Sequence, residues 1–434
     1  MSIDYEDLFH KGFDEYRLFV NSMIAQRARL AREPIRFVKV EDGTPIDSEG
    51  RAIEDMHGLA SLGQRHPAIT AALEEFLRSD RPSWFPSRVN PYAGRLARTL
   101  AERTGYETAF FPCTGTEAVE AALKLARAAT GRPRFVSLVG AYHGCTFGSC
   151  ALMTPGIFRD GFAPHLPGVV HIASGDAEAL TRELAQGDVA AVVVEPVQGE
   201  GGIRPLPQPF IDALCSATAA HGTLLVADEV QTGLGRTGAL LATADWPRRP
   251  DVVLLGKALG GGLVPISAML TRRAIFEGAY GRDFAIGEAH NTTFQGNALG
   301  AVAALTMLDL LDEELFARVR ANGALLRERL EVGLRGKPLF VEVRSAGLMI
   351  GVELAPFSHP WLSFEHFGFP ELSTKPLTAA LVCHRLYERG YFVFPCGHDW
   401  STVRIQPRLD VAPEKLIAFA DAFVEELQAL AELD

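Results

Sequence analysis

The chain has 434 residues, of which 47% are hydrophobic and 22% charged, as is typical of soluble globular proteins. Its formal net charge is −11 and it has no Lys/Arg-rich run, which argues against nucleic acid or an anionic membrane as a partner. The acidic N-terminus does not resemble a signal or transit peptide, and no apolar stretch reaches the roughly 20 residues that span a bilayer. The six cysteines form no C-x-x-C pair, so we expect reduced thiols, a cytoplasmic protein and no metal site.

The first 270 residues contain a change of pattern. A helical stretch and a turn-rich strand meander over 37–56 come first, and from about 107 short apolar runs alternate with helical segments. These runs are TAFFP, RFVSLV, GVVHI, VAAVVVEP, TLLVADE, DVVLLG and ISAMLT. Near-continuous apolar strands separated by helices predict a mostly parallel α/β sheet covered on both faces. Ligands of such folds bind beyond the carboxyl ends of the strands, where we therefore seek the site.

The remainder of the chain predicts a smaller unit. Long helices follow from about residue 300, and then strands (LFVEVRS, LMIGVEL, YFVFP and TVRIQP) alternate with helices. An aromatic segment over 356–373 interrupts this pattern and reads as a loop. We expect a large domain over 81–330 and a smaller α+β domain formed by 1–80 and 331–434.

Two carboxylates, Asp228 and Glu229, end one apolar run in the segment LLVADEVQTGLGRTG. They could hold Mg²⁺ for a nucleotide, or one of them could neutralise a cationic group of a cofactor. A nucleotide hydrolase would need the motif G-x-x-x-x-G-K-[ST], but Lys257 of the only suitable Gly-Lys pair is followed by Ala258, and position 251 is Asp. The cofactor alternative is therefore favoured.

Other strand ends carry groups that suit a cofactor. Thr114 and Glu117 have the spacing of a capping box, so the helix that starts near Gly115 offers free N–H groups to a phosphate. Tyr142 could lie against a heteroaromatic ring. Lys257 follows an apolar strand, where a lysine is costly unless it is paired or neutral. Each residue alone also has an ordinary explanation, as a helix cap, a packed aromatic or a surface lysine.

The ligand that needs all of these groups together is pyridoxal 5′-phosphate (PLP). Its phosphate suits a helix N-terminus, and its ring stacks on an aromatic side chain. Its pyridine nitrogen stays protonated beside a carboxylate, a role that we assign to Asp228. Its aldehyde forms a Schiff base with a lysine, here Lys257.

Several segments resemble those of class III (omega-type) aminotransferases of PLP fold type I, over nearly the whole chain. They are CTGTEAVEAALKLAR, YHG, EPVQGEGGI, LLVADEVQTGLGRTG, GKALGGG, TTFQGNALG and VRIQPRL. The resemblance implies a fold type I enzyme whose large domain has a mostly parallel seven-stranded sheet. It also implies a ping-pong reaction through Lys257 that moves an amino group between an amine or omega-amino compound and a keto acid, pyruvate or 2-oxoglutarate.

The resemblance further implies roles in cofactor binding. Gly115 and Thr116 match the phosphate-binding backbone, and Tyr142 matches the aromatic residue that stacks on the ring. Gln231 matches the residue near the ring hydroxyl. Thr293 matches a threonine that reaches the phosphate of the neighbouring subunit, which implies a homodimer with shared active sites.

The substrate side is most similar to the ornithine, acetylornithine and 4-aminobutyrate aminotransferases. There, an arginine matching Arg404 binds the α-carboxylate, and a glutamate matching Glu200 pairs with that arginine when an amine without a carboxylate enters. Two positions depart from the subgroup. Cys145 replaces an arginine that grips the distal carboxylate of glutamate, which favours pyruvate over 2-oxoglutarate, and His57 replaces a substrate-contacting tyrosine of the ornithine enzymes.

Two other reaction classes use the same scaffold and lysine. They are the aminomutases and racemases, and the decarboxylases of the dialkylglycine type. The glutamate-semialdehyde aminomutases generally lack the glutamate that matches Glu200, which disfavours that option. Among these classes only a transaminase needs a keto acid acceptor. At this stage the amine, the acceptor, any assembly beyond a dimer and the role of the loop over 356–373 stay open.

Overall fold

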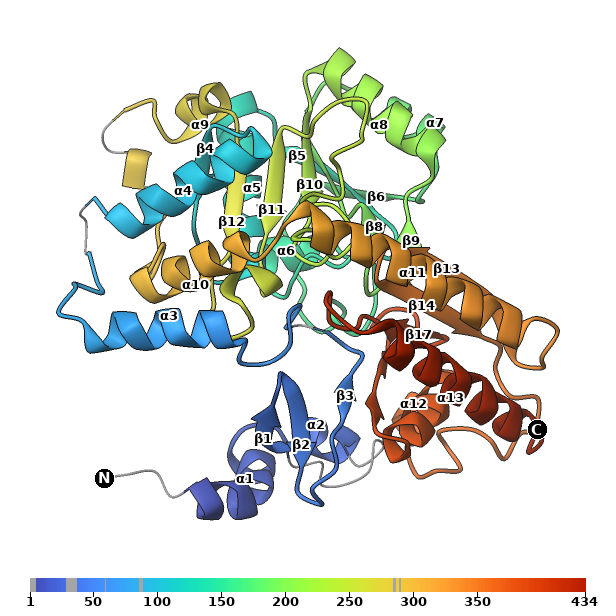
Figure 1. The fold of residues 1–434 in the computed structure, drawn as a ribbon. Coiled ribbons are helices and arrows are strands. Elements are labelled where there is room, and N and C mark those ends of the chain that lie inside the picture. The colour runs from blue at the N-terminus through green and yellow to red at the C-terminus, as the bar shows by residue number, and fades with distance from the viewer. Residues whose placement is uncertain (1–4, 29–36, 59, 86–88, 284–285, 289) are drawn as a thin grey trace.

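A seven-stranded sheet forms the centre of the larger part of the molecule (Figure 1). The computed structural model describes residues 5–28, 37–58, 60–85, 89–283, 286–288 and 290–434. The strand order is β4 (Thr108–Phe110), β12 (Ala268–Thr271), β11 (Val252–Leu255), β10 (Leu224–Asp228), β7 (Val189–Val194), β5 (Arg134–Leu138) and β6 (Val169–Ile172). Only β12 runs antiparallel to its neighbours in this sheet. The predicted α/β fold is thereby confirmed, with one strand inside each of the seven predicted runs.

The alternation of side chains along the strands explains why the runs are apolar throughout. Phe135, Ala191 and Val193 pack into a core with α5 (Gly115–Thr130) and α9 (Arg273–Ala279) on one face. Val136 and Val192 pack on the opposite face with α7 (Ala177–Leu184) and α8 (Gln208–His221). Because successive side chains point to opposite faces and both faces are covered, most strand positions are apolar.

The remaining elements of this part surround the β4 edge and the strand ends. The helices α3 (Pro67–Arg78), α4 (Pro91–Thr104) and α10 (Ala298–Asp309) pack together beside β4. Short elements lie in the connections: α6 (Phe147–Ala151), the hairpin of β8 (Val197–Gln198) with β9 (Arg204–Pro205), and the 3-10 helices η2 (Lys257–Gly260) and η3 (Ile286–Glu288). None of the described helices has the length and apolarity needed to cross a membrane.

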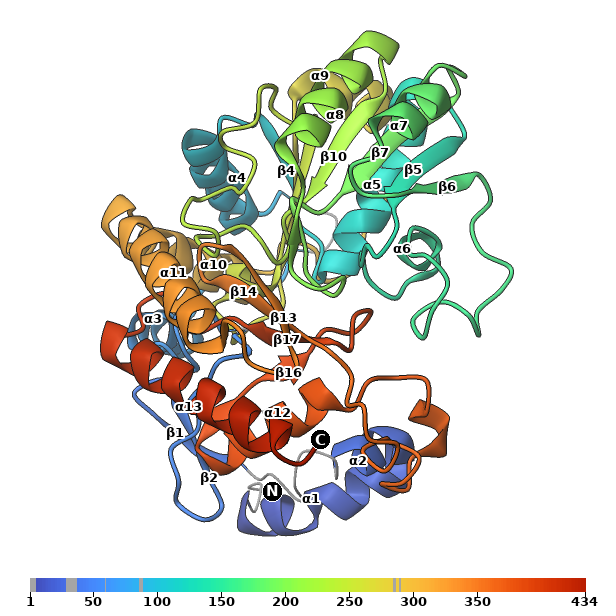
Figure 2. The same ribbon diagram turned by 90° about the vertical axis from the view of Figure 1, so that its right-hand side faces the viewer.

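The C-terminal part is built on a four-stranded antiparallel sheet, which lies between the large sheet and the helices α12 and α13 (Figure 2). Its strand order is β13 (Phe340–Ala346), β14 (Met349–Leu354), β17 (Thr402–Ile405) and β16 (Phe394–Pro395). Its helices are α11 (Glu313–Leu334), α12 (Thr378–Glu388) and α13 (Pro413–Ala431), and the 3-10 helix η4 (Pro370–Leu372) lies in the predicted loop.

The N-terminal segment joins this C-terminal part. It contains α1 (Tyr5–Phe19), α2 (Ser22–Ala28) and the hairpin of β1 (Phe37–Glu41) with β2 (Thr44–Asp47). Its strand β3 (Glu54–Asp55) pairs in parallel with β15 (Tyr391–Phe392). Segments from the N-terminal and C-terminal parts of the chain therefore pair in one small sheet.

Candidate active site

Six of the residues singled out in the sequence line one cavity of about 460 Å³ between the two sheets. Tyr142, Gln231 and Lys257 follow strands of the large sheet. Glu200 comes from the turn between β8 and β9. His57 follows β3, and Arg404 lies on β17, so the cavity joins segments that are far apart in the sequence.

The N-terminus of α5 is capped as predicted. Thr114 N donates to Glu117 Oε2 (2.8 Å), and Glu117 N donates to Thr114 Oγ1 (3.4 Å). In the part of the chain that the structure describes, the N–H groups of Gly115 and Thr116 have no acceptor. Gly115 is required because a Cβ there would lie 2.9 Å from Val230 Cγ1. This helix start can therefore bind an anion through two free N–H groups.

The side chain of Thr116 has a different role. Its hydroxyl lies 2.8 Å from Thr146 Oγ1 and 2.7 Å from Ser149 Oγ, and it accepts a hydrogen bond from Thr146 N (3.2 Å). A Cβ on Gly144, whose φ is +112°, would lie 2.4 Å from Thr116 Cβ. These contacts fix the loop that carries Tyr142 against α5, so Thr116 can offer a phosphate only its backbone.

Asp228 is held in a fixed orientation at the end of β10. Its Oδ2 accepts a hydrogen bond from His143 Nδ1 (2.8 Å), and its Oδ1 accepts one from Val230 N (3.1 Å). Burial disfavours the charged imidazole, but the hydrogen bond to Asp228 and the negative charges of Asp228 and Glu195 together outweigh it and raise the pKa of His143. The carboxylate is thus oriented on a buried strand end, where it can neutralise a cationic ring nitrogen.

Glu229, the neighbour of Asp228, has a structural role. It is fully buried and accepts hydrogen bonds from Thr243 N (3.0 Å) and Thr243 Oγ1 (2.6 Å). Burial raises the pKa of its carboxyl to about 7. The two carboxylates therefore have different roles. Glu229 closes the loop over 229–243, and Asp228 is the one oriented at the strand end.

Glu195 is a buried carboxylate at the end of β7 that the sequence interpretation left without a role. Its Oε1 accepts a hydrogen bond from Tyr142 N (2.8 Å), and its Oε2 accepts one from Gly199 N (3.0 Å). Burial raises the pKa of this carboxyl to about 7. Glu195 thereby ties the loop of Tyr142 to the turn that carries Glu200. Its sequence signal is the same as that of Asp228, a carboxylate directly after an apolar strand.

Lys257 begins η2 directly after β11 with a φ of +41°, a conformation that costs energy for a residue with a Cβ. Its Nζ has no hydrogen-bond or ion-pair partner among the described residues. The side chain is accessible to solvent from the cavity, and protein atoms surround it on its other sides. Burial and the charge of Arg404 lower the pKa of its ammonium, which favours the neutral, nucleophilic amine.

Arg404 and Glu200 form a buried ion pair in the cavity wall. Arg404 Nη1 donates to Glu200 Oε1, and Gly397 N donates to Glu200 Oε2 (2.7 Å). Burial opposes ionisation of Glu200, but Arg404, the N–H of Gly397 and the charge of Lys257 together outweigh it and lower the pKa of this carboxyl. Arg404 Nη2 lies 3.3 Å from Nε2 of His57. Burial and Arg404 lower the pKa of His57 to about 3, so its imidazole is neutral.

Besides Gly115, Thr116 and Asp228, two further predicted residues do not line this cavity. Cys145 is exposed, and its Sγ lies 3.3 Å from the hydroxyl of Tyr142. Thr293 is also exposed and lines a separate recess with Trp84 and Phe85. The structure does not bring Thr293 to Lys257 of its own chain.

The groups in and around the cavity fit PLP. The free N–H groups of α5 suit its phosphate, and the oriented carboxylate of Asp228 suits its ring nitrogen. The ring of Tyr142 is held edge-on by Phe158 at a centroid distance of 5.2 Å and can cover one side of a heteroaromatic ring. The unpaired Nζ of Lys257 suits its aldehyde.

Comparison with known proteins identifies the family. The family model described as aminotransferase class III matches residues 28–427. A putrescine aminotransferase of Pectobacterium atrosepticum is 34% identical over 387 residues, which cover 86% of this chain and 78% of that protein. The ornithine aminotransferase of Toxoplasma gondii ME49 has a TM-score of 0.84 and 28% identity, with all of both chains covered. A PLP-bound amine transaminase of an uncultivated Pseudomonas species has a TM-score of 0.79 and 26% identity, with 91% of this chain and 94% of that chain covered.

These findings agree with a cavity lined by a lysine and an arginine–glutamate pair, with an oriented aspartate at the neighbouring strand end. The chain belongs to the class III aminotransferases, PLP-dependent enzymes of fold type I that transfer amino groups between amines and keto acids.

Proposed function

We propose that Lys257 carries the amino-group transfer and that Asp228 keeps the ring nitrogen of the cofactor protonated. When bound, PLP supplies an aldehyde that takes up amino groups and a ring that accepts electrons. The N–H groups of Gly115 and Thr116 bind its phosphate, Tyr142 stacks on its ring, and Gln231 serves its hydroxyl. Lys257 Nζ moves the proton that leaves the substrate Cα. The support for these roles is the unpaired lysine in the same cavity as the aromatic ring, with the oriented carboxylate at the neighbouring strand end.

The buried pair of Arg404 and Glu200 carries the proposal for the substrates. Arg404 holds the carboxylate of a keto acid or α-amino acid. When the substrate is an amine without that carboxylate, Glu200 pairs with Arg404 instead. The pair lines the same cavity as Lys257 and is buried, so either residue left alone would be an unpaired charge. The name of the Pectobacterium relative supports an amine without a carboxylate as the donor.

The keto acid in this proposal is pyruvate in preference to 2-oxoglutarate. Cys145 cannot make the bidentate contact that an arginine makes with a second carboxylate. Its Sγ lies 3.3 Å from the hydroxyl of Tyr142, beside the ring that covers the cofactor in this proposal.

The enzyme works as a homodimer in the cytoplasm in this proposal. Thr293 is exposed and lies apart from the cavity of its own chain, which supports a contact with the phosphate in a neighbouring subunit. All six cysteines are free thiols, which supports a reducing compartment. Sedimentation tests the assembly, because dilution to monomers should release PLP. A monomer that turns over substrate would contradict the dimer.

Chemical trapping tests the role of Lys257. Borohydride treatment of the yellow enzyme should attach the cofactor to the peptide that contains Lys257, and Asp228→Asn should keep the protein folded while losing most of the activity. Labelling of a different lysine would refute the assignment, and so would an Asp228→Asn enzyme that binds PLP and turns over at the normal rate.

A further inference from the structure

One face of α12 lines the cavity that also holds the Arg404–Glu200 pair. Ala380, Cys383, His384 and Tyr387 follow the helical spacing of three and four residues, and all four line the cavity. Apolar and aromatic side chains complete the wall, namely Ile157, Phe158, Phe392, Val393, Phe394 and Trp400. We call the surface formed by these lining side chains the α12 wall.

Charged groups are scarce around this space. Among the described residues that line the cavity, only Glu200, Lys257 and Arg404 carry charged side chains. Glu200 is already paired with Arg404, and its second oxygen accepts the N–H of Gly397. His384 supplies no negative charge. A second ammonium group on a substrate would therefore be buried at the α12 wall without a counter-ion, which is costly.

The α12 wall is held in place from its outer side. Arg385 Nε donates to Glu426 Oε2 (2.5 Å), and Arg389 Nη1 donates to Glu425 Oε2 (2.7 Å), which fixes α12 on α13. The guanidinium of Arg51, which does not line the cavity, lies 5.6 Å from the ring centroid of Tyr387. The apolar space is thus largely preformed, as is usual for small-molecule sites, whose volumes range from roughly 300 to 1,000 Å³.

We propose that the α12 wall receives the uncharged, apolar tail of the amine substrate. The preferred donors are then primary amines whose tail of several carbons carries no charge at its far end. In contrast to the putrescine that gives the Pectobacterium relative its name, α,ω-diamines are poor substrates of this enzyme. This inference rests on the proposed function, because it requires that the amine reacts at Lys257 in the same cavity.

A series of amines tests the proposal in the holoenzyme with pyruvate as acceptor. Straight-chain monoamines from propylamine to heptylamine are compared with α,ω-diamines of equal length. We expect kcat/KM to rise about fourfold for each added methylene group, the gain for burying one such group. Each diamine should be at least tenfold poorer than its monoamine. A flat series, or diamines that match or exceed the monoamines, would overturn the inference.

A binding measurement gives a second readout that does not depend on turnover. The N,N-dimethyl derivatives of the same monoamines cannot be transaminated, and calorimetry on the holoenzyme should show Kd falling with tail length by the same factor. Kd independent of tail length would contradict the α12 wall as the tail site.

Two variants locate the tail. Ala380→Phe places a large ring in the cavity and should abolish the dependence on tail length. Glu388→Phe adds the same ring to an exposed position of α12 outside the cavity and should retain it. If both variants retain the dependence, the tail lies elsewhere and the inference is wrong.

Different results would refute the proposed function and the inference about the α12 wall. If neither alanine nor any amine transfers its amino group to a keto acid, the proposed function fails and this inference with it. If alanine and short amines react but longer tails bring no gain, only the inference about the α12 wall fails.

Discussion

Two arginines occupy equivalent positions on the small sheet and do different work. Arg344 of β13 pairs with Gly351 of β14, and Gly351 pairs with Arg404 of β17, so the two side chains project from the same face. Gly351 leaves room between them for Ile203, whose Cβ would lie 2.8 Å from an added Cβ. Both arginines therefore meet the turn that carries Glu200, one on each side of Ile203.

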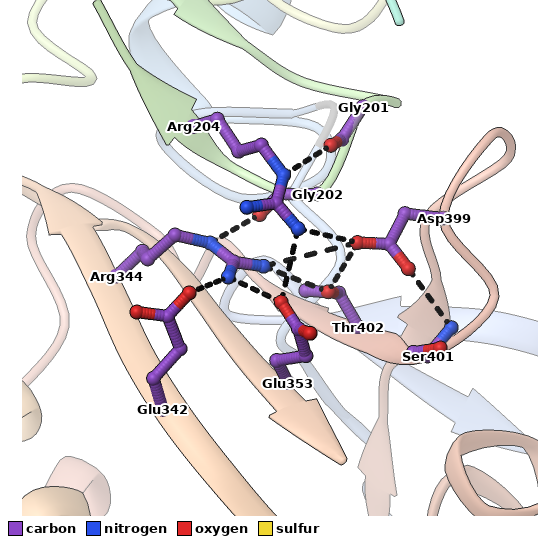
Figure 3. A network of polar contacts seen from close by, with 9 residues as sticks. All are labelled: Gly201, Gly202, Arg204, Glu342, Arg344, Glu353, Asp399, Ser401 and Thr402. Carbon is purple, nitrogen blue, oxygen red and sulfur yellow. Dashed lines mark hydrogen bonds and ion pairs between the residues drawn. The ribbon is translucent and has the colours of Figure 1, made fainter. Parts of the chain in front are cut away.

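The guanidinium of Arg344 is saturated with acceptors (Figure 3). Its Nε donates to Gly202 O (2.9 Å) and its Nη2 to Thr402 Oγ1 (2.9 Å), while its Nη1 donates to Glu342 and Glu353. The neighbouring Arg204, Asp399, Gly201 and Ser401 extend this network. It ties the loop over 397–402 to the turn over 200–204.

Arg404 has far fewer partners. Its only carboxylate partner among the described residues is Glu200, and its buried Nε has no acceptor there. It faces the cavity rather than a ring of acceptors. Arg344 and Arg404 have the same residue type and equivalent places on the sheet. They differ in the number of satisfied donors, and this number separates a structural arginine from one that is available to a substrate.

The largest expected effect is on stability. Arg344→Met leaves Glu342 without its cation and leaves Glu353 and Asp399 with Arg204 alone, and should lower the free energy of unfolding by about 3 kcal/mol. Arg404→Met should cost only about 1 kcal/mol, because Glu200 keeps the N–H of Gly397 and faces the open cavity. Urea unfolding measures both values. Equal losses of unfolding free energy in the two variants would contradict the different roles of Arg344 and Arg404.

Acid should diminish the contribution of Arg344. Burial opposes ionisation of Glu353, but the hydrogen bonds and positive charges of Arg344 and Arg204 together outweigh it and lower the pKa of this carboxyl below its ordinary 4.5. A depressed carboxyl pKa stabilises the fold above the unfolded value, and that contribution is lost as pH falls through the folded value. The gap in unfolding free energy between the wild type and Arg344→Met should therefore be constant above pH 5 and narrow below about pH 4.5. A gap that stays unchanged down to pH 3.5 would contradict the assignment.

A smaller effect is expected for one hydroxyl in the network. Thr402 is fully buried, accepts a hydrogen bond from Arg344 Nη2 and donates one to Asp399 Oδ2 (2.9 Å). Thr402→Val keeps the shape but removes both hydrogen bonds, so the free energy of unfolding should fall by about 1 kcal/mol. In the Arg344→Met background the same substitution should cost less, because one partner is already absent. Full additivity of the two losses would show that Thr402 and Arg344 act independently.

The smallest effect is expected beside Arg404. The ring of His57 packs edge-on against Phe392 and Phe394, at centroid distances of 5.6 and 6.1 Å. His57→Phe keeps an aromatic ring but removes the nitrogens next to Arg404, so the KM for the keto acid should rise about threefold, as for a weak neutral contact. Because the pKa of His57 is about 3, the pH profile of kcat/KM between pH 6 and 9 should keep its shape. A profile that shifts in this range would show that His57 titrates during turnover.

The cofactor side of the site was predictable because it follows local rules. Each buried strand appeared as an apolar run, and the residue after a run lies at the sheet edge where ligands bind. Lys257 and Asp228 could be found in this way, and the capping box of Thr114 and Glu117 predicted the start of α5. The same rule applied to β7 would have led to Glu195.

The substrate side could not be derived from local patterns. His57, Glu200 and Arg404 come together only through the packing of the two sheets, and resemblance to a family was the sole guide to them. The α12 wall has no motif, because its residues become a cavity lining only when the helix packs over β16 and β17. The aromatic loop illustrates the same limit, since Phe364 packs on Trp400 of the cavity while Trp361 stays 66% exposed.

The central claim is that Arg404 exchanges Glu200 for a substrate carboxylate, and single-turnover kinetics test it most directly. The rate at which the holoenzyme reacts with alanine, divided by its rate with an alkylamine, is measured in the wild type, in Arg404→Ala and in Glu200→Gln. We expect the ratio to fall on the order of 10²-fold in Arg404→Ala, about the value of a buried charge-assisted contact, and to rise about tenfold in Glu200→Gln. If both variants slow the two substrates by the same factor, the pair is only structural and the claim is wrong.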